Sequence, residues 1–188
     1  MEIVVIVGLV LAAVYFWYVA IIGRRNKALE ALSGVDVQLK QRSNLIPNIL
    51  KIANKMMEHE KELMSEITQL REQSEKNYDT KDTAAVKEHL AASEKLAGKM
   101  AQFMVRMEQY PDIKSDATMV QAQQTYSEVE ALIAAARRFY NASVTSLNNS
   151  VQIFPGNMIA GMAGVAEMPF YEGDEASKAP VDASAFLN

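Results

Sequence analysis

An uncharged apolar run at the start of the chain limits what it can fold into. Residues 3–22 read IVVIVGLVLAAVYFWYVAII and contain no charged or amide side chain. As a helix rising about 1.5 Å per residue, this run extends about 30 Å, the thickness of the hydrocarbon layer of a bilayer. The sequence therefore predicts one transmembrane helix, and its predicted membrane-contacting residues include Ile3, Leu11, Trp17 and Ile22.

The flanks of the run favour a retained anchor over a cleaved signal peptide. A signal peptide begins with basic residues and has a shorter apolar segment, whereas only Met1 and Glu2 precede this run. Basic residues follow it instead, at Arg24, Arg25 and Lys27. Because basic flanks tend to stay in the cytoplasm, we expect the N-terminus outside and the remaining chain on the cytoplasmic side.

Composition argues against several functional classes. The chain has no Cys, which excludes disulfides, thiolate metal sites and cysteine nucleophiles. Its net charge is −4, with no basic stripe beyond the anchor, so nucleic-acid binding is not expected. The two histidines lie on separate predicted helices, and the sequence after His59 is not a zinc-binding HExxH motif. We therefore expect no catalytic, metal or cofactor site and no enzymatic activity.

Helical periodicity dominates the rest of the chain. Apolar residues recur at alternating spacings of three and four from Leu32 to Leu70, as in helices that pack on one another. This seam predicts a helix over residues 24–76, which can continue directly from the span and is kinked at Pro47. Two more long helices and a short one are predicted at 82–109, 115–153 and 157–167.

These elements predict an all-α protein, because no segment shows the alternation of a strand. The expected architecture is an N-terminal transmembrane helix followed by an elongated antiparallel bundle of three long helices and a short C-terminal helix. We assign residues 1–23 to the anchor, 24–170 to the bundle and 171–188 to a disordered acidic tail.

Two charged residues fall on the apolar seam. Arg42 and Glu60 lie about 27 Å apart along a straight helix and cannot pair with each other. Each needs a partner elsewhere because an unpaired buried charge is costly. Glu130 and Arg137, on the predicted third long helix, are the natural candidates. A cross-helix ion pair that fixes register is the structural interpretation, and a polar site for a ligand or proton is the functional one.

Two segments are predicted as contacts between subunits. The first is the polar juxtamembrane stretch, represented by Asp36, Gln38, Lys40 and Asn48. The second is the small-residue helix near the C-terminus, represented by Met158, Gly161, Met162 and Gly164. The alternatives are a solvated face for the first segment, and for the second a cap on its own bundle or a lipid contact.

Three motifs resemble those of a known family. Residues 35–48 read VDVQLKQRSNLIPN, residues 110–114 read YPDIK, and residues 133–141 read IAAARRFYN, followed by Asn148 and Phe154-Pro155. In order and spacing they are similar to the LemA family, with departures at Ala131 and Leu147. The resemblance implies a single-pass bacterial inner-membrane protein with a long helical bundle. No enzymatic activity is established for that family as a whole, and one branch is tied to magnetosome membranes.

These patterns together predict a membrane-anchored, non-enzymatic helical scaffold that self-assembles into a homo-oligomer and organises or remodels the membrane. Its expected partners are copies of itself, membrane lipid and another membrane protein. The alternative is an adaptor that docks a membrane protease or a sensor protein through the juxtamembrane helix. An enzyme is the third class, and alanine substitutions at His59 and Glu60 would test it.

Overall fold

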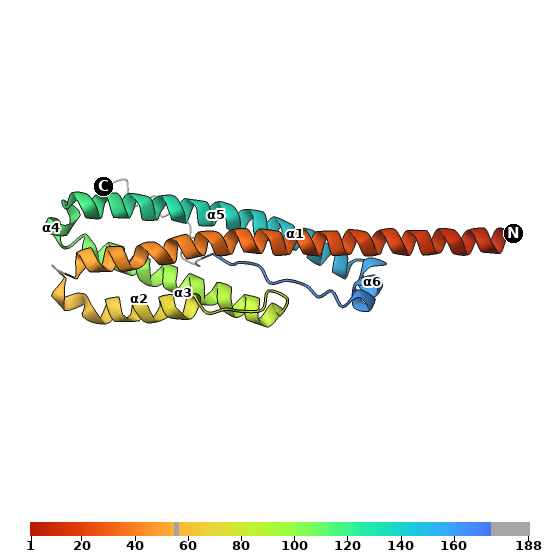
Figure 1. The fold of residues 1–188 in the computed structure, drawn as a ribbon, viewed down its shortest axis with the longest axis horizontal. Coiled ribbons are helices and arrows are strands. Elements are labelled where there is room, and N and C mark those ends of the chain that lie inside the picture. Colours follow the sequence, from red (N-terminus) through yellow and green to blue (C-terminus); the bar gives the residue numbers. More distant parts are fainter. Residues whose placement is uncertain (55–56, 174–188) are drawn as a thin grey trace, which may run out of the picture.

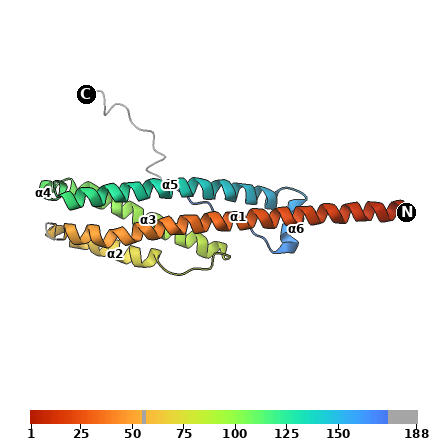
Figure 2. The ribbon, with the colours of Figure 1, turned by 45° about the horizontal axis from the view of Figure 1, so that its top comes forward.

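The computed structural model describes residues 1–54 and 57–173, and within them the protein is helical and without strands. The elements are α1 (Glu2–Ala53), the 3-10 helix η1 (Glu58–Glu60), α2 (Lys61–Ser74), α3 (Thr83–Met107), α4 (Pro111–Lys114), α5 (Ala117–Gln152) and α6 (Gly156–Ala163). They form an elongated antiparallel bundle with α5 on one side of α1 and the α2–α3 pair on the other (Figures 1 and 2). The predicted all-α class is confirmed.

Helix α1 runs without a break from the apolar run into the bundle (Figure 1). Pro47 lies inside this helix and cannot donate a backbone hydrogen bond to the Ser43 carbonyl oxygen four residues earlier. The freed oxygen accepts a hydrogen bond of 3.0 Å from Arg71 Nε of α2 instead. Pro47 therefore leaves the Ser43 carbonyl oxygen free to accept a hydrogen bond from α2, and it does not end α1.

The single helix predicted over residues 24–76 is wrong, because the chain reverses after Ala53 and forms α1 and α2. The apolar seam continues across this reversal, with Ile49 and Ala53 before it and Leu63 and Ile67 after it all buried. No glycine or proline occurs in residues 54–60 to mark a turn. Periodicity alone therefore could not reveal the break.

The ends of the later helices lie close to their predicted positions. Asp116 caps α5 by accepting from the Thr118 and Met119 amides, and Asp82 caps α3 in the same way. Helix α3 ends at Met107, and Pro111 occupies the first turn of the short helix α4. Helix α6 ends at Ala163 and not near residue 167, because Gly164 adopts a left-handed conformation with φ of 63°.

After α6 the chain runs back along the bundle as an extended segment, residues 165–173, which we call the strap (Figure 1). Val165, Met168 and Tyr171 of the strap are buried. Tyr171, which was assigned to the tail from the sequence, thus belongs to the packed structure. Residues 174–188 of the predicted tail lie outside the described residues.

The buried apolar residues form two clusters along the bundle. The cluster nearer the anchor includes Leu32 and Leu39 of α1 and Tyr140 of α5. The distal cluster includes Ile46 of α1 and Phe103 of α3. Along α1 the boundary between them falls at Arg42 and Ser43, both buried. A polar layer therefore divides the core at the position of the seam arginine.

Candidate functional site

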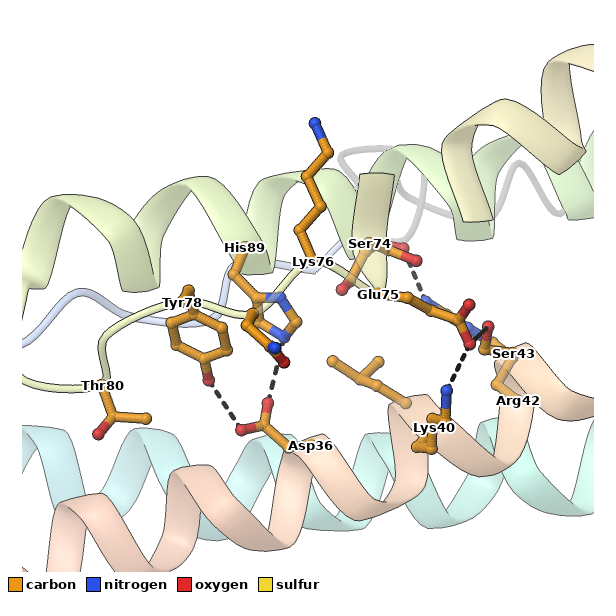
Figure 3. A pocket seen from close by; sticks show the side chains of 13 residues that line it. Asp36, Lys40, Arg42, Ser43, Ser74, Glu75, Lys76, Tyr78, Thr80 and His89 are labelled. Atoms are coloured by element: carbon orange, nitrogen blue, oxygen red, sulfur yellow. Dashed lines mark hydrogen bonds and ion pairs between the residues drawn. The ribbon is translucent and has the colours of Figure 1, made fainter. Parts of the chain in front are cut away.

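A polar cleft of about 330 Å³ opens beside this layer (Figure 3). Helix α1 presents residues three to four positions apart toward it, the end of α2 and the following loop close one side, and α3 closes another. We call it the polar cleft, and its lining includes Asp36, Lys40, Arg42, Ser43, Ser74, Glu75, Lys76, Tyr78, Thr80, His89 and Ser93. Their side chains bind mainly one another, in three groups.

The first group joins the α2–α3 loop to α1 and α3. Asp36 accepts a 2.8 Å hydrogen bond from the Tyr78 hydroxyl, and its other oxygen lies 3.1 Å from His89 Nε2 (Figure 3). The Tyr78 and His89 rings stack with centroids 4.1 Å apart. Burial, followed by the hydrogen bond to Asp36, raises the pKa of Tyr78, so the phenol stays protonated and remains a donor.

The second group is centred on Glu75 at the end of α2. Lys40 Nζ lies 2.7 Å from Glu75 Oε1, and the Ser43 hydroxyl donates to the same oxygen at 2.8 Å. Arg71 approaches the other oxygen at 3.2 Å. The hydrogen bond from Lys40 is the largest influence that lowers the pKa of Glu75, with Ser43 and Arg71 adding to it.

This arrangement predicts a small acid sensitivity. Because the Glu75 pKa is lower in the folded state, its stabilisation is present above the ordinary value of 4.5 and is lost as pH falls through the folded-state pKa. Chemical unfolding of the full-length protein and of Glu75→Gln should differ by about 1 kcal/mol or less at about pH 7, and that difference should shrink toward about pH 3. Glu72→Gln, an exposed neighbour, should show no such convergence.

The third group contains the seam arginine. Arg42 is 2% exposed, donates to the Ser93 carbonyl oxygen at 2.8 Å and reaches Glu130 at 3.3 Å. The structure thus brings together Arg42 and Glu130, the two residues suggested from the sequence. Arg42 Nε and the Ser93 hydroxyl are buried without a hydrogen-bond partner among the described residues. This side chain ties α1, α3 and α5 together at the boundary between the two cores.

The other suggested pair, Glu60 with Arg137, does not form. Glu60 instead receives two hydrogen bonds, at 2.8 and 3.1 Å, from Arg106 of α3. Arg137 instead lies over the Tyr171 ring of the strap, 5.8 Å from its centroid. The reversal after α1 places Glu60 at the distal end of the bundle, whereas Arg137 lies in the half of α5 nearer the anchor. The prediction failed because α5 runs antiparallel to α1, so that Arg137 follows Glu130 toward the anchor whereas Glu60 follows Arg42 toward the distal end.

The predicted juxtamembrane contact residues divide into two sets. Asp36 and Lys40 line the polar cleft and make internal contacts, while the Lys40 side chain remains 61% exposed, and their role in a subunit contact stays a prediction. Gln38 is half-buried, with a buried side-chain oxygen that lacks a partner in the part of the chain described. Asn48 is exposed. Sequence reasoning missed the partners Tyr78, Glu75 and Ser93, since nothing in their local sequence distinguishes them from ordinary turn and helix residues.

The strap is held by a polar ladder along α5. The side-chain amide of Asn141 donates to the Tyr171 carbonyl and accepts from its amide, both at 2.9 Å. Asn148 makes the same pair of bonds to Met168, also at 2.9 Å. Seven helical residues and three extended residues both cover about 10 Å, so the two spacings match. The Tyr140 hydroxyl adds a 2.7 Å bond to the Pro169 carbonyl.

The short helix α6 packs against α1 within the apolar run and against the end of α5. A Cβ at Gly156 would overlap the Ser150 carbonyl oxygen, so only glycine permits this close approach. Met158 and Met162 point outward and are exposed, and a Cβ at Gly161 would meet open space. Gly164 serves to end the helix. In the described residues, α6 therefore both covers part of its own chain and leaves an apolar surface free.

The polar cleft carries charges of both signs. Its lining includes the acidic Asp36 and Glu75 and the basic Lys40, Arg42 and Lys76, and most of these groups are held by internal bonds. Within residues 1–54 and 57–173 no group of three or more acidic, histidine or cysteine side chains is placed to hold a metal ion. What the arrangement does physically is fasten the α2–α3 hairpin to α1 and α5.

These features define a class of protein. A long helical bundle continues without a break from α1, and α1 is long and apolar enough to cross a membrane by length and composition. Ile3 and Leu11 are 77% and 64% exposed on this helix, while Trp17 and Ile22 are more covered. The architecture is that of a membrane-associated helical-bundle protein.

Comparison with known sequences identifies the family. A sequence model of the LemA family matches residues 31–184, and the chain belongs to this family. A curated relative, Protein LemA of Metamycoplasma hominis, is 27% identical over 181 residues, which cover 93% of this chain and 79% of that protein. The match includes the polar cleft, the polar layer and the strap.

Proposed function

We propose that the protein is a non-enzymatic scaffold, anchored in the bacterial inner membrane by residues 3–22, whose bundle assembles with copies of itself on the cytoplasmic side. The unbroken α1 supports the anchoring, because it links the apolar run to the bundle with no flexible joint. Arg24, Arg25 and Lys27 immediately after the run support the cytoplasmic side. The bundle axis follows α1, so the bundle stands away from the bilayer (Figure 1).

One observation carries the proposal of self-assembly. The outward face of α1 beyond the membrane has an exposed stripe, the α1 stripe, whose members are uncharged and spaced by three and four: Gly34, Val37, Gln41, Asn44 and Asn48. This is the spacing of a seam between parallel helices, and two anchors inserted in the same direction present their α1 helices in parallel. The stripe is proposed as the contact in preference to Asp36 and Lys40, because those two side chains are already engaged by Tyr78 and Glu75.

The absence of enzymatic activity is part of the same proposal. It is supported by the internal bonding of the titratable groups in the polar cleft, where Asp36, Glu75 and Arg42 each have partners within the chain. His59, considered as a catalytic candidate from the sequence, is exposed at the distal turn. Its neighbour Glu60 is engaged with Arg106.

The test is the mass of the full-length protein in lipid nanodiscs or mild detergent. Wild-type protein should give a uniform multi-chain particle, and Val37→Arg should reduce its mass because a charge enters the apolar part of the α1 stripe. Val105→Arg is the matched control, since Val105 is also exposed but lies on α3. A wild-type monomer would overturn the scaffold and favour an adaptor that uses this face for another membrane protein. Equal masses for both variants would overturn the α1 stripe as the contact.

A further inference from the structure

Helix α6 lies beside the part of α1 that the proposed anchor places within the bilayer. An apolar hollow between them is lined by Leu11, Val14 and Tyr18 of α1 and by Ile159, Met162 and Ala163 of α6. At Gly156 a Cβ would lie 3.6 Å from the Trp17 ring. Both views of the fold show α6 next to α1, on the side of the bundle toward the N-terminus (Figures 1 and 2).

The depth of α6 follows from its neighbours on α1. Tyr18 and Leu11 lie about 6 Å and about 17 Å along the helix axis from Ile22, the last residue of the apolar run. One leaflet contributes about 15 Å of hydrocarbon. A helix packed against residues 11–18 therefore lies at the level of acyl chains and not at that of the headgroups.

The sequence around α6 suits this position. Residues 139–166 contain no charged side chain, although charged residues are frequent elsewhere in the bundle. The large side chains that α6 and the preceding turn expose are Ile153, Phe154, Met158 and Met162, the last at 87%. Exposing these apolar side chains to water is unfavourable, whereas exposing them to lipid acyl chains is favourable.

Several backbone groups around α6 are satisfied within the chain, as a hydrocarbon environment favours. The Val165 amide donates to the Ala160 carbonyl at 3.0 Å as the helix ends. At its start, Asn157 directs its side-chain oxygen to the Met158 amide at 2.8 Å. Pro155, just before the helix, has no amide hydrogen to satisfy.

We infer that α6 and residues 153–155 form a second membrane-contacting element, inserted among the acyl chains of the leaflet on the basic side of the anchor without crossing the bilayer. Its partner is lipid, contacted by Phe154, Met158 and Met162. The inference rests on the proposed anchoring by residues 3–22 and is independent of self-assembly.

Because the chain has no Cys, single nitroxide labels can report depth in full-length protein reconstituted into phosphatidylethanolamine–phosphatidylglycerol vesicles. The positions are Met162→Cys on α6, Ile6→Cys in the span and Val105→Cys on the bundle, all highly exposed. Oxygen collides preferentially with labels in lipid, and a water-soluble nickel complex with labels in water. The oxygen-to-nickel collision ratio at Met162→Cys should be several-fold higher than at Val105→Cys and approach that at Ile6→Cys.

The outcomes separate the inference from the function on which it rests. A ratio at Met162→Cys equal to that at Val105→Cys, with a high ratio at Ile6→Cys, overturns the insertion of α6 and leaves the anchor intact. A label at Met162→Cys shielded from both reagents overturns lipid contact in favour of a protein interface. Low ratios at both Ile6→Cys and Met162→Cys overturn the anchor together with the inference.

Discussion

Glu130→Ala should destabilise the bundle more than Arg42→Met, although Arg42 is the more buried partner. Without Glu130, a guanidinium that is 2% exposed loses its carboxylate, which costs about 3 kcal/mol. Arg42→Met removes the charge and keeps much of the volume, while Glu130 is 35% exposed and can be hydrated. The Arg42→Met substitution should cost about 1–2 kcal/mol, mainly because the Ser93 carbonyl oxygen loses its hydrogen-bond donor. Chemical unfolding of the full-length variants measures the change in unfolding free energy for each substitution.

The double variant supplies the internal control. Arg42→Met combined with Glu130→Ala should be more stable than Glu130→Ala alone, because it removes the stranded charge. Glu128→Ala, an exposed carboxylate on the same helix, should change little. If Glu130→Ala proves harmless, the charge of Arg42 is compensated by another group, and the polar layer does not depend on this ion pair.

Asn148→Ala should release the strap from α5. The substitution removes both bonds to Met168 and leaves its amide and carbonyl buried without partners, at a cost of about 2–3 kcal/mol. Hydrogen exchange at the Met168 and Tyr171 amides should accelerate first, before exchange in α3. Adding Asn141→Ala should extend the effect, since it removes the second rung of the ladder.

Asn149→Ala is the matched control for the strap. Asn149 is the next residue along α5 but is exposed, and the ladder does not use its side chain. Its exchange pattern should match the wild type. Equal protection of Met168 in Asn148→Ala and in the wild type would show that Val165, Met168 and Tyr171 hold the strap by apolar packing alone.

Local signals in the sequence identified much of this fold. The helix through the apolar run and the seam through Leu32 and Ile46 each depend on residues close in sequence, and the structure forms that helix and buries that seam as expected. The reversal after Ala53 was not predictable, because residues 54–60 contain no glycine or proline and the apolar spacing persists through them. The partner of Glu60 was misassigned for a separate reason: α5 is antiparallel to α1, which places Arg137 toward the anchor, and Arg106 of α3 pairs with Glu60 instead.

Only part of the candidate site could be predicted from the sequence. Arg42 stood out because a charge on an apolar seam requires a partner, and Glu130 was a reasonable one. The roles of Asp36 and Lys40 depend on Tyr78, His89 and Glu75, which reach them only after the α2–α3 hairpin folds back. The role of Asn148 likewise depends on a strap with no periodic signal of its own. Such contacts are long-range, and single-sequence patterns do not record them.

The unbroken α1 gives the protein the mechanics of a lever. From Ile22 to Ala53 the helix extends about 46 Å beyond the proposed span, so tilting the span by about 10° would displace the distal turn by about 8 Å. Membranes of different thickness impose different tilts on one span. A small change in the bilayer would thus become a movement comparable to a whole helix diameter at the far end, where Glu60 and Arg106 join the hairpin.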